Sequence, residues 1–154
     1  MFILFGMPIA QIMLFGFAIT NEINNVNIAI LDKSKDNETQ KIINKISASK
    51  YFNIEQDIVN ENQIESVFKK GKVKAVLVFE TDFGKNLQTL KQAKVQVLTD
   101  ATDPNMANTI ANYVNAILQN YTQEINKNNK PNHQIQTQTQ LYYNPELKSV
   151  FNFV

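Results

Sequence analysis

The stretch VNIAILDKSKDNETQKIINKIS (Val26–Ser47) joins two patterns and decides the fold. Its first seven residues are β-branched or apolar with few exceptions, which is typical of a strand in the centre of a sheet. After a polar turn, Ile42, Ile43 and Ile46 recur at a spacing that places them on one face of a helix. A strand followed directly by an amphipathic helix predicts the opening of an α/β domain.

The same alternation continues along the chain. Asn60 and Gln63 resemble a capping box that starts a second helix, and Gly71 ends it. A third, short helix is expected after the most apolar strand. The further strands are expected at residues 51–58, 73–79 and 95–100. These elements predict a layered α/β domain with a largely parallel five-stranded sheet flanked by helices.

The clearest helix start lies at Asp103 and Pro104, a good N-cap residue followed by proline at the first helical position. A sustained apolar stripe then predicts a long helix. It consists of Met106, Ile110, Tyr113, Val114, Ile117, Tyr121 and Ile125. A polar break leads to HQIQTQTQLYY (133–143), whose strict alternation predicts a half-exposed strand at a sheet edge. The direction of this strand relative to the first one stays open.

The chain begins with an apolar segment. Residues 1–19 carry no charge, and Gln11 is their only strongly polar side chain. A helix of that length rises about 28 Å, close to the roughly 30 Å of hydrocarbon in a bilayer. We therefore predict a transmembrane helix over residues 1–20. A signal-like segment, which lacks its basic start here, and a buried core helix are the alternatives.

The flank of this segment bears on orientation. Basic residues concentrate on the cytoplasmic side of a membrane span. The first lysine after the segment is Lys33, so the sequence favours a following domain that lies outside the cytoplasm.

Composition excludes several kinds of site. A net charge of +1 gives no reason to expect a nucleic-acid partner. The absence of cysteine excludes thiolate nucleophiles and cysteine-ligated metals, and four scattered glycines cannot form a phosphate-binding loop. The single histidine, His133, is expected to be a solvated loop residue. We therefore expect no catalytic residue, no metal site and no cofactor.

Carboxylates follow three of the predicted strands. Asp32, Glu80 and Asp100 stand at carboxyl ends, where open α/β sheets bind ligands. The favoured interpretation is that these residues cap helices and turn the chain. The alternative is a receiver-like cluster that holds a magnesium ion in a soluble enzyme.

Several stretches resemble, in order and spacing, the permeases of type-2 ATP-binding-cassette (ABC) exporters. LFGFAITNEINNVNIAILDKSKD (14–36) is similar to the junction between the first membrane span and the large external domain of that family. GKVKAVLVFETDFGKNL (71–87) and VLTDATDPNMANTIANYVNAIL (97–118) are similar to the interior of that domain. YYNPELKSVFNFV (142–154) is similar to the stretch before the second span.

The resemblance implies that the chain is a fragment of such a permease. Residues 1–20 would be its first span, surrounded by lipid, residues 21–143 an extracytoplasmic α/β domain, and residues 144–154 a linker that returns to a second span. The domain would contribute to efflux across the bacterial inner membrane without catalysis. ATP would be hydrolysed by a separate ABC ATPase subunit, and a second permease copy and a periplasmic adaptor are further expected partners.

An alternative function is a single-span anchored sensor or ligand-binding module, with its ligand at the sheet edge near Asp32 and Asp100. For the permease function, we predict two surfaces, distant from the bilayer, at which the domain meets a partner. The candidate residues are Asp100, Asp103 and Asn105 in an acidic turn, and Gln136, Gln138 and Gln140 on the last strand.

Overall fold

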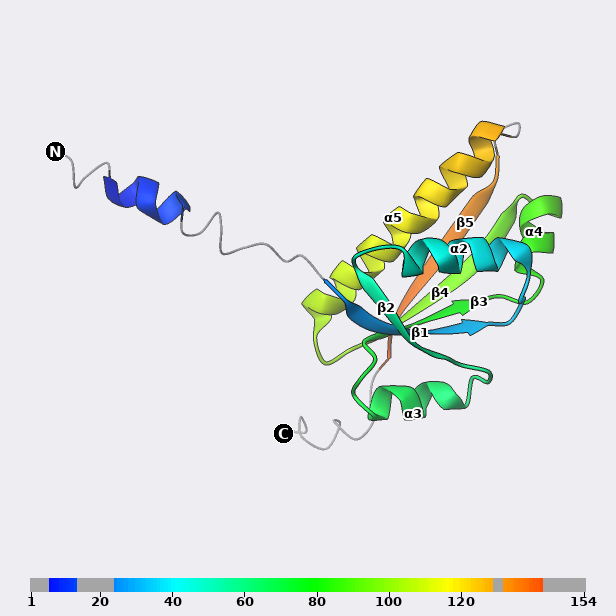
Figure 1. Ribbon diagram of the computed structural model, residues 1–154, viewed down its shortest axis with the longest axis horizontal. Helices are drawn as coiled ribbons and strands as arrows, with labels where there is room; N and C mark the ends of the chain where they lie inside the picture. Colours follow the sequence, from blue (N-terminus) through cyan, green and yellow to red (C-terminus); the bar gives the residue numbers. More distant parts are fainter. Residues whose placement is uncertain (1–5, 14–23, 129–131, 143–154) are drawn as a thin grey trace, which may run out of the picture.

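The computed structural model describes residues 6–13, 24–128 and 132–142 (Figure 1). In the α/β domain, strands and helices alternate as the sequence predicts. They are β1 (Val26–Asp32), α2 (Asn37–Ser47), β2 (Phe52–Asp57), α3 (Gln63–Lys69), β3 (Ala75–Phe79), α4 (Phe83–Thr89), β4 (Gln92–Asp100), α5 (Pro104–Asn128) and β5 (Gln134–Tyr142).

The five strands form one mixed sheet in the order β2-β1-β3-β4-β5. The pairs β1–β2, β1–β3 and β4–β5 are parallel, whereas β3–β4 is antiparallel. The sheet is therefore mostly parallel, as predicted, but β4 and β5 run opposite to the first three strands. Between β3 and β4, the short helix α4 is followed by Lys91 in the left-handed conformation (φ 59°), which turns the chain back along β3.

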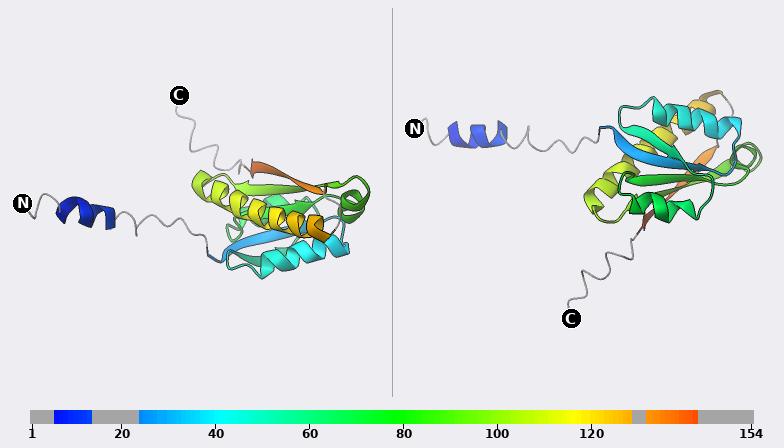
Figure 2. Two further views of the ribbon diagram at one scale, coloured as in Figure 1. Left: turned by 90° about the horizontal axis from the view of Figure 1, so that it is seen from above. Right: turned by 60° about the horizontal axis from the view of Figure 1, so that its bottom comes forward.

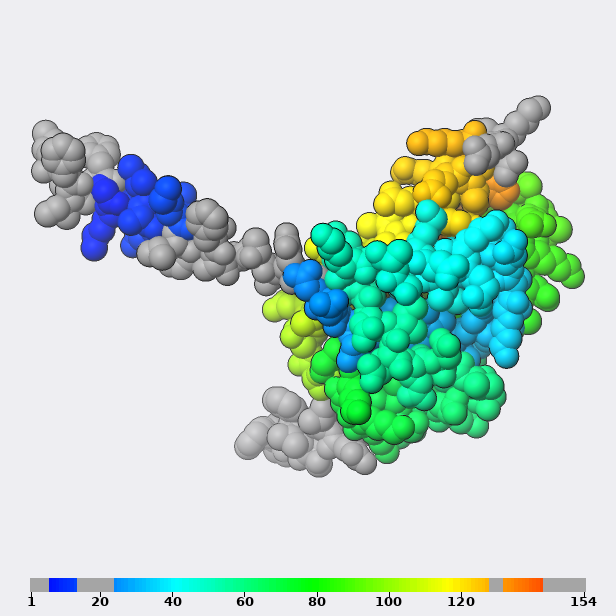
Figure 3. All heavy atoms as spheres, viewed as in Figure 1, coloured from blue at the N-terminus to red at the C-terminus, as the bar shows by residue number. Residues whose placement is uncertain are grey.

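Helices cover the two faces of the sheet unequally (Figures 1 and 2). Helices α2, α4 and α5 lie on one face, where Ile46 and Val114 pack with Leu77 of the sheet. Helix α3 alone lies on the other face, where Phe68 packs against Val76. The space-filling view shows the side chains of α2 and of the β2–α3 segment covering much of one side of the molecule (Figure 3). Because helices cover both faces of β3, all five of its side chains are buried, and all five are apolar.

Helix starts agree only partly with the sequence. The Asp103 carboxylate accepts a hydrogen bond from the N–H of Met106 at 3.0 Å, which confirms Asp103 as a capping residue. The expected capping box at Asn60 is wrong. Helix α3 begins later, after Asn62, whose side chain makes no capping hydrogen bond. The Gln63 side chain does reach back to the N–H of Asn60, at 3.2 Å, but across a turn that precedes the helix.

The described part of the apolar N-terminal segment is a helix over residues 6–13. Its apolar side chains are exposed, with Met7 at 67% and Ile12 at 73%, so a helix buried in the core is wrong for these residues. Within the described residues, no helix is both long and apolar enough to cross a bilayer. The rest of the predicted span, and the predicted linker over residues 144–154, lie outside the described residues.

The described chain enters and leaves the domain at the same end of the sheet. Strand β1 starts there, and β5 ends there because it runs antiparallel to β1. One row of paired residues crosses the sheet near that end: Ile28 pairs with Ala75, Ala75 with Thr99, and Thr99 with Leu141. Three steps of about 4.8 Å between strands put Ile28 roughly 14 Å from Leu141.

Candidate functional site

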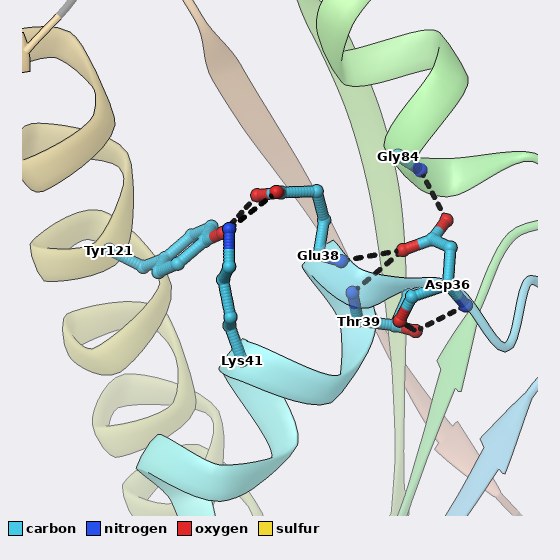
Figure 4. A network of polar contacts seen from close by, with 6 residues as sticks. All are labelled: Asp36, Glu38, Thr39, Lys41, Gly84 and Tyr121. Carbon is cyan, nitrogen blue, oxygen red and sulfur yellow. Dashed lines mark hydrogen bonds and ion pairs between the residues drawn. The ribbon is translucent and has the colours of Figure 1, made fainter.

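The carboxyl ends of β1 and β3 lie side by side, and each strand is followed by a helix on the same face of the sheet. Helix α2 follows β1, and helix α4 follows β3. In open α/β sheets, ligands bind outside the carboxyl ends of the strands. The residues after β1 and at the start of α4 therefore form the first candidate site (Figure 4).

The carboxylate of Asp36 lies between the starts of α2 and α4 at this edge of the sheet. One of its oxygens accepts hydrogen bonds from the N–H groups of Glu38 and Thr39, both at 2.9 Å. The other oxygen accepts from the N–H of Gly84 at 2.6 Å and from the hydroxyl of Ser34. The Thr39 hydroxyl accepts a hydrogen bond from the N–H of Asp36 at 3.2 Å and completes a capping box for α2. The chain's own carboxylate thus joins the starts of α2 and α4.

Protonation of Asp36 is opposed by these contacts. Burial pushes the pKa of its carboxyl upward, but the hydrogen bonds from the Ser34 hydroxyl and the three backbone N–H groups outweigh that effect. The pKa of Asp36 therefore lies below its ordinary value. The side chain remains an anion that accepts four hydrogen bonds.

Asp32 has a similar local role. Its carboxylate accepts hydrogen bonds from the N–H of Ser34 at 3.0 Å, the N–H of Lys35 at 2.9 Å and the hydroxyl of Thr39 at 2.7 Å. Lys35 adopts a left-handed conformation (φ 52°) within this turn. The interpretation that Asp32 turns the chain before a helix is confirmed.

The three strand-end carboxylates do not converge. Glu80 lies near Asp32 at one end of the sheet, where it accepts hydrogen bonds from Lys94 N–H at 3.0 Å and Asn86 at 3.2 Å. Asp100 lies at the opposite end, because β4 runs antiparallel to β3. A receiver-like cluster or a ligand site shared by Asp32 and Asp100 is therefore wrong. Among the described residues, no group of three or more metal-ligating side chains is gathered.

A second group of contacts extends the Asp36 site to α5 (Figure 4). Glu38 accepts hydrogen bonds from Lys41 at 2.7 Å and from the buried hydroxyl of Tyr121. Burial raises the pKa of Glu38, but the bonds from Lys41 and Tyr121 outweigh it and leave this pKa below its ordinary value. Burial and the Glu38 carboxylate raise the pKa of Tyr121 well above its ordinary value. The group holds α2, α4 and α5 together and offers no free nucleophile.

The predicted acidic turn is formed as a set of local hydrogen bonds. Asp100 accepts from the N–H of Thr102 at 3.0 Å and from its hydroxyl at 2.7 Å, with the ammonium of Lys74 3.4 Å away. Burial raises the pKa of Asp100, but the Thr102 and Lys74 contacts outweigh it and lower this pKa overall. Asp103 caps α5, and Asn105 is exposed in its first turn.

The predicted glutamine face is exposed along β5. Gln136, Gln138 and Gln140 point to the face that carries α3, and the amide of Gln96 donates to Gln140 at 2.9 Å. Asp100 pairs with Tyr142, so the acidic turn and the end of the glutamine face lie side by side. Both were expected far from the bilayer. The structure places the turn at the end where the chain enters and leaves the domain.

An open groove of about 360 Å³ borders the glutamine face beside α3. Its apolar floor includes Val78 and Leu98, and its rim includes Glu65 and Gln140. Tyr142 also lines the groove, and its ring stacks on that of Phe68 with the centroids 4.9 Å apart.

The expectation for His133 is wrong. This residue is only 7% exposed. The side chain of Asn126 in α5 contacts its backbone N–H, its backbone carbonyl and its ring. The side-chain oxygen Oδ1 of Asn126 accepts from the His133 backbone N–H and lies 3.0 Å from its ring Nδ1. The side-chain amide of Asn126 donates to the His133 backbone carbonyl at 3.0 Å. The ammonium of Lys91 lies 3.4 Å from Nε2. His133 therefore fixes the start of β5 to the end of α5.

Sequence reasoning missed Asp36, Gly84 and Tyr121. Two local signals were present. Asp36 is followed three residues later by Thr39, a capping-box spacing, and Gly84 stands at a helix start, where glycine often marks close backbone approach. No local signal pairs Asp36 with Gly84, since 48 residues separate them.

Comparison with known proteins shows that this chain is similar to ABC transporter proteins. The family model described as ABC-2 family transporter protein matches residues 1–154. The chain is 29% identical over 138 residues to the probable multidrug ABC transporter permease YbhR of Escherichia coli (strain K12), covering 89% of this chain and 37% of that protein. It is 24% identical over 143 residues to the probable multidrug ABC transporter permease YbhS of the same strain, covering 90% of this chain. The chain thus spans 37% of the length of each relative.

A solved structure shares the fold. The crystal structure of a domain assigned to an ABC type-2 transporter from Thermotoga maritima MSB8 superposes with a TM-score of 0.55 at 13% identity. The match covers 81% of this chain and 97% of that domain. The family model covers the whole chain, which confirms the resemblance of its sequence to the permeases of type-2 ABC exporters. The chain belongs to the ABC-2 family of transporter proteins, and its α/β fold is a domain of a transporter permease.

Proposed function

We propose that this domain is the extracytoplasmic part of an export permease, inserted between a first and a second membrane span. In this proposal, residues 1–20 form the first span in the bacterial inner membrane, and residues 144–154 return the chain to the second. The domain performs no chemistry. ATP binding in partner ATPase subunits drives the spans between arrangements, and the domain shapes the exit path for the substrate or receives a periplasmic adaptor.

The observation that carries the proposal is the common end at which the chain enters and leaves. Ile28 and Leu141 share one row of the sheet about 14 Å apart. Packed helices lie 8–10 Å apart, so two neighbouring spans can continue from these two positions after short linkers. A sheet with all strands parallel would instead end β5 at the far end and need a return over its whole length.

The exposed helix of residues 6–13 also supports this placement. Met7, Ile9, Ile12 and Met13 are each at least 60% exposed, and the domain core does not cover them. Several exposed apolar side chains on one short helix are typical of a segment that contacts lipid or another apolar partner.

The Asp36 site supports a role without chemistry or ligand binding. The carboxyl ends of β1 and β3 would be the default ligand site, and here four hydrogen bonds already satisfy the Asp36 carboxylate that lies beside them. The relatives are named as transporter permeases rather than enzymes. The sensor alternative required Asp32 and Asp100 at one edge, and the antiparallel β4 separates them.

Cysteine labelling tests which side of the membrane the domain occupies. Residues 1–154 carry no cysteine, and any cysteine elsewhere in the complete permease is first replaced by serine, so that each single variant is a specific reporter. Gln88→Cys, on the exposed end of α4, is introduced into the complete permease, and intact cells are treated with a membrane-impermeant maleimide. We expect labelling without permeabilisation. Ala75→Cys, fully buried in β3, is the control and stays unlabelled until denaturation. Labelling of Gln88→Cys only after permeabilisation contradicts the proposal.

A further inference from the structure

Strand β5 forms one edge of the sheet (Figure 2), and every second residue of it turns its backbone groups outward. The N–H of Gln134 bonds to the carbonyl of Lys91, and the carbonyl of Tyr142 accepts from Ala101, so both residues point toward β4. Backbone groups of successive strand residues point to opposite sides. The N–H and carbonyl groups of Ile135, Thr137, Thr139 and Leu141 therefore point away from the sheet. Within the described residues, no strand pairs with them.

The two edges of the sheet differ in how they resist pairing. Edge strand β2 carries Glu55 and Asp57, and its ladder with β1 is interrupted between Ile28 and Ala29. Charges and bulges are the devices that keep an edge from joining another sheet. Strand β5 has neither: QIQTQTQLY contains no charged residue and no proline, and its register with β4 is continuous over nine residues. An edge left open in this way is suited to a strand partner.

The sequence of β5 is complementary to itself. In an antiparallel pair centred on Gln138, Thr137 faces Thr139 of a second copy, and Ile135 faces its Leu141. This centre uses all four outward-pointing residues in hydrogen-bonded pairs, whereas a shift in either direction leaves one or more of them unpaired. The pairing also places Leu141, which is 52% exposed, against an apolar side chain.

We propose that the outer edge of β5 is an interface with a second copy of this chain, formed by antiparallel pairing of the two β5 strands about Gln138. The contact is isologous, with the two-fold axis perpendicular to the joined sheet at Gln138. Helices α2, α4 and α5 of both copies then lie on one face of a continuous ten-stranded sheet. No titratable group of β5 other than Tyr142 lies at the contact, so like charges do not oppose it.

The pairing fixes an orientation for two copies that share a membrane. The ends at which the chain enters and leaves point in opposite directions from the axis. Two equivalent copies in one membrane are related by an axis along the bilayer normal, and here this axis is perpendicular to the joined sheet. On the proposed membrane placement, which the interface itself does not require, the joined sheet therefore lies parallel to the bilayer, with the spans of the two copies on either side of it.

A single cysteine tests the interface. Across the axis, Gln138 faces Gln138 of the second copy in a pair that is not hydrogen-bonded, for which the Cα atoms are about 4.5 Å apart. This separation lies within the range of a disulfide. We expect Gln138→Cys, in the otherwise cysteine-free complete permease in its native membrane, to convert mostly to a disulfide-linked dimer on mild oxidation. Glu55→Cys, on the other exposed edge, is the matched control and stays monomeric. Absence of the dimer for Gln138→Cys, or equal dimer formation by both variants, overturns the proposal.

A proline variant separates the interface from folding. The N–H of Thr139 points outward, so Thr139→Pro removes donors from the interface and leaves the β4–β5 ladder intact. In the Gln138→Cys background, Thr139→Pro should abolish most of the cross-linking while the thermal unfolding midpoint changes little. Unchanged cross-linking in a folded double variant overturns the proposal. A cross-link to a different protein in place of the dimer overturns it as well and shows that another protein lies at this edge. The side of the membrane plays no part in these readouts.

Discussion

The carboxylate of Asp36 accepts a hydrogen bond from the backbone N–H of Gly84 at 2.6 Å, and this contact joins two helix starts that lie 48 residues apart in the sequence. A Cβ atom added at Gly84 would lie 2.8 Å from the nearer oxygen of that carboxylate and 2.9 Å from its carbon. The carboxylate cannot move aside freely, because Glu38 and Thr39 hold its other oxygen. Gly84 is therefore required for close approach.

Gly84→Ala is expected to destabilise the domain by about 1–3 kcal/mol through this overlap. The sign is informative, since Gly→Ala inside a helix ordinarily stabilises by about 1 kcal/mol. Urea unfolding measures the difference. In an Asp36→Ala background the overlapping atoms are gone, and Gly84→Ala should be neutral or stabilising there. An equal loss in both backgrounds would show that the close approach is not the cause.

Acid should weaken the domain through the same site. The pKa values of Asp36 and Glu38 lie below the ordinary values of 3.8 and 4.5. The folded state therefore binds fewer protons than the unfolded state in this range, and the stability from these groups, complete above the ordinary values, is lost as pH falls through the folded-state pKa values. We expect the free energy of unfolding to fall below about pH 4.5.

Asp36→Asn should be less stable than the parent at neutral pH and show a shallower fall with acid. Urea unfolding over a series from neutral to acid pH measures both, with Asp57→Asn on the exposed edge strand β2 as the matched control. A slope in Asp36→Asn as steep as in the parent argues against the assignment.

The spacing of apolar residues along the sequence predicted the helices and strands, because this spacing reflects which side chains are buried. The alternating face of β5 and the apolar stripe of α5 are examples, and Ile110 and Val114 are fully buried as their spacing indicates. The Asp103 cap was readable for the same reason, since it involves a residue only three positions away.

Nonlocal geometry explains what the sequence did not show. The direction of β4 depends on the left-handed turn at Lys91, and this direction sends Asp100 to the end opposite Asp32. The contacts of His133 depend on Asn126 of α5, seven residues earlier in the sequence. The Asp36–Gly84 contact depends on two loops that only the sheet brings together.

Tyr121→Phe isolates the link between α2 and α5. The variant loses the hydrogen bond to Glu38, and we expect a cost of about 1 kcal/mol at neutral pH. Because the folded protein raises the pKa of Tyr121 above the ordinary 10.0, the unfolded state releases its proton first, and the stability from Tyr121 is lost as pH rises past 10. The deficit of the variant should therefore shrink in alkali. Unfolding free energies of both proteins, compared at neutral and alkaline pH, measure this change, and a constant deficit contradicts it.

Asn126→Ala tests how β5 is held at its start. The side chain of Asn126 accepts from the His133 N–H and donates to the His133 carbonyl, both at 3.0 Å, so its loss leaves backbone groups of a buried residue without partners. Such a loss costs about 1–3 kcal/mol. Hydrogen exchange should quicken most at the first residues of β5, while the central ladder of β1 with β3 keeps its protection. Asn120→Ala, exposed on the same helix, is the matched control and should leave exchange unchanged. If exchange rises equally in β1 and β5, the side chain contributes to global stability rather than to the attachment of this edge strand.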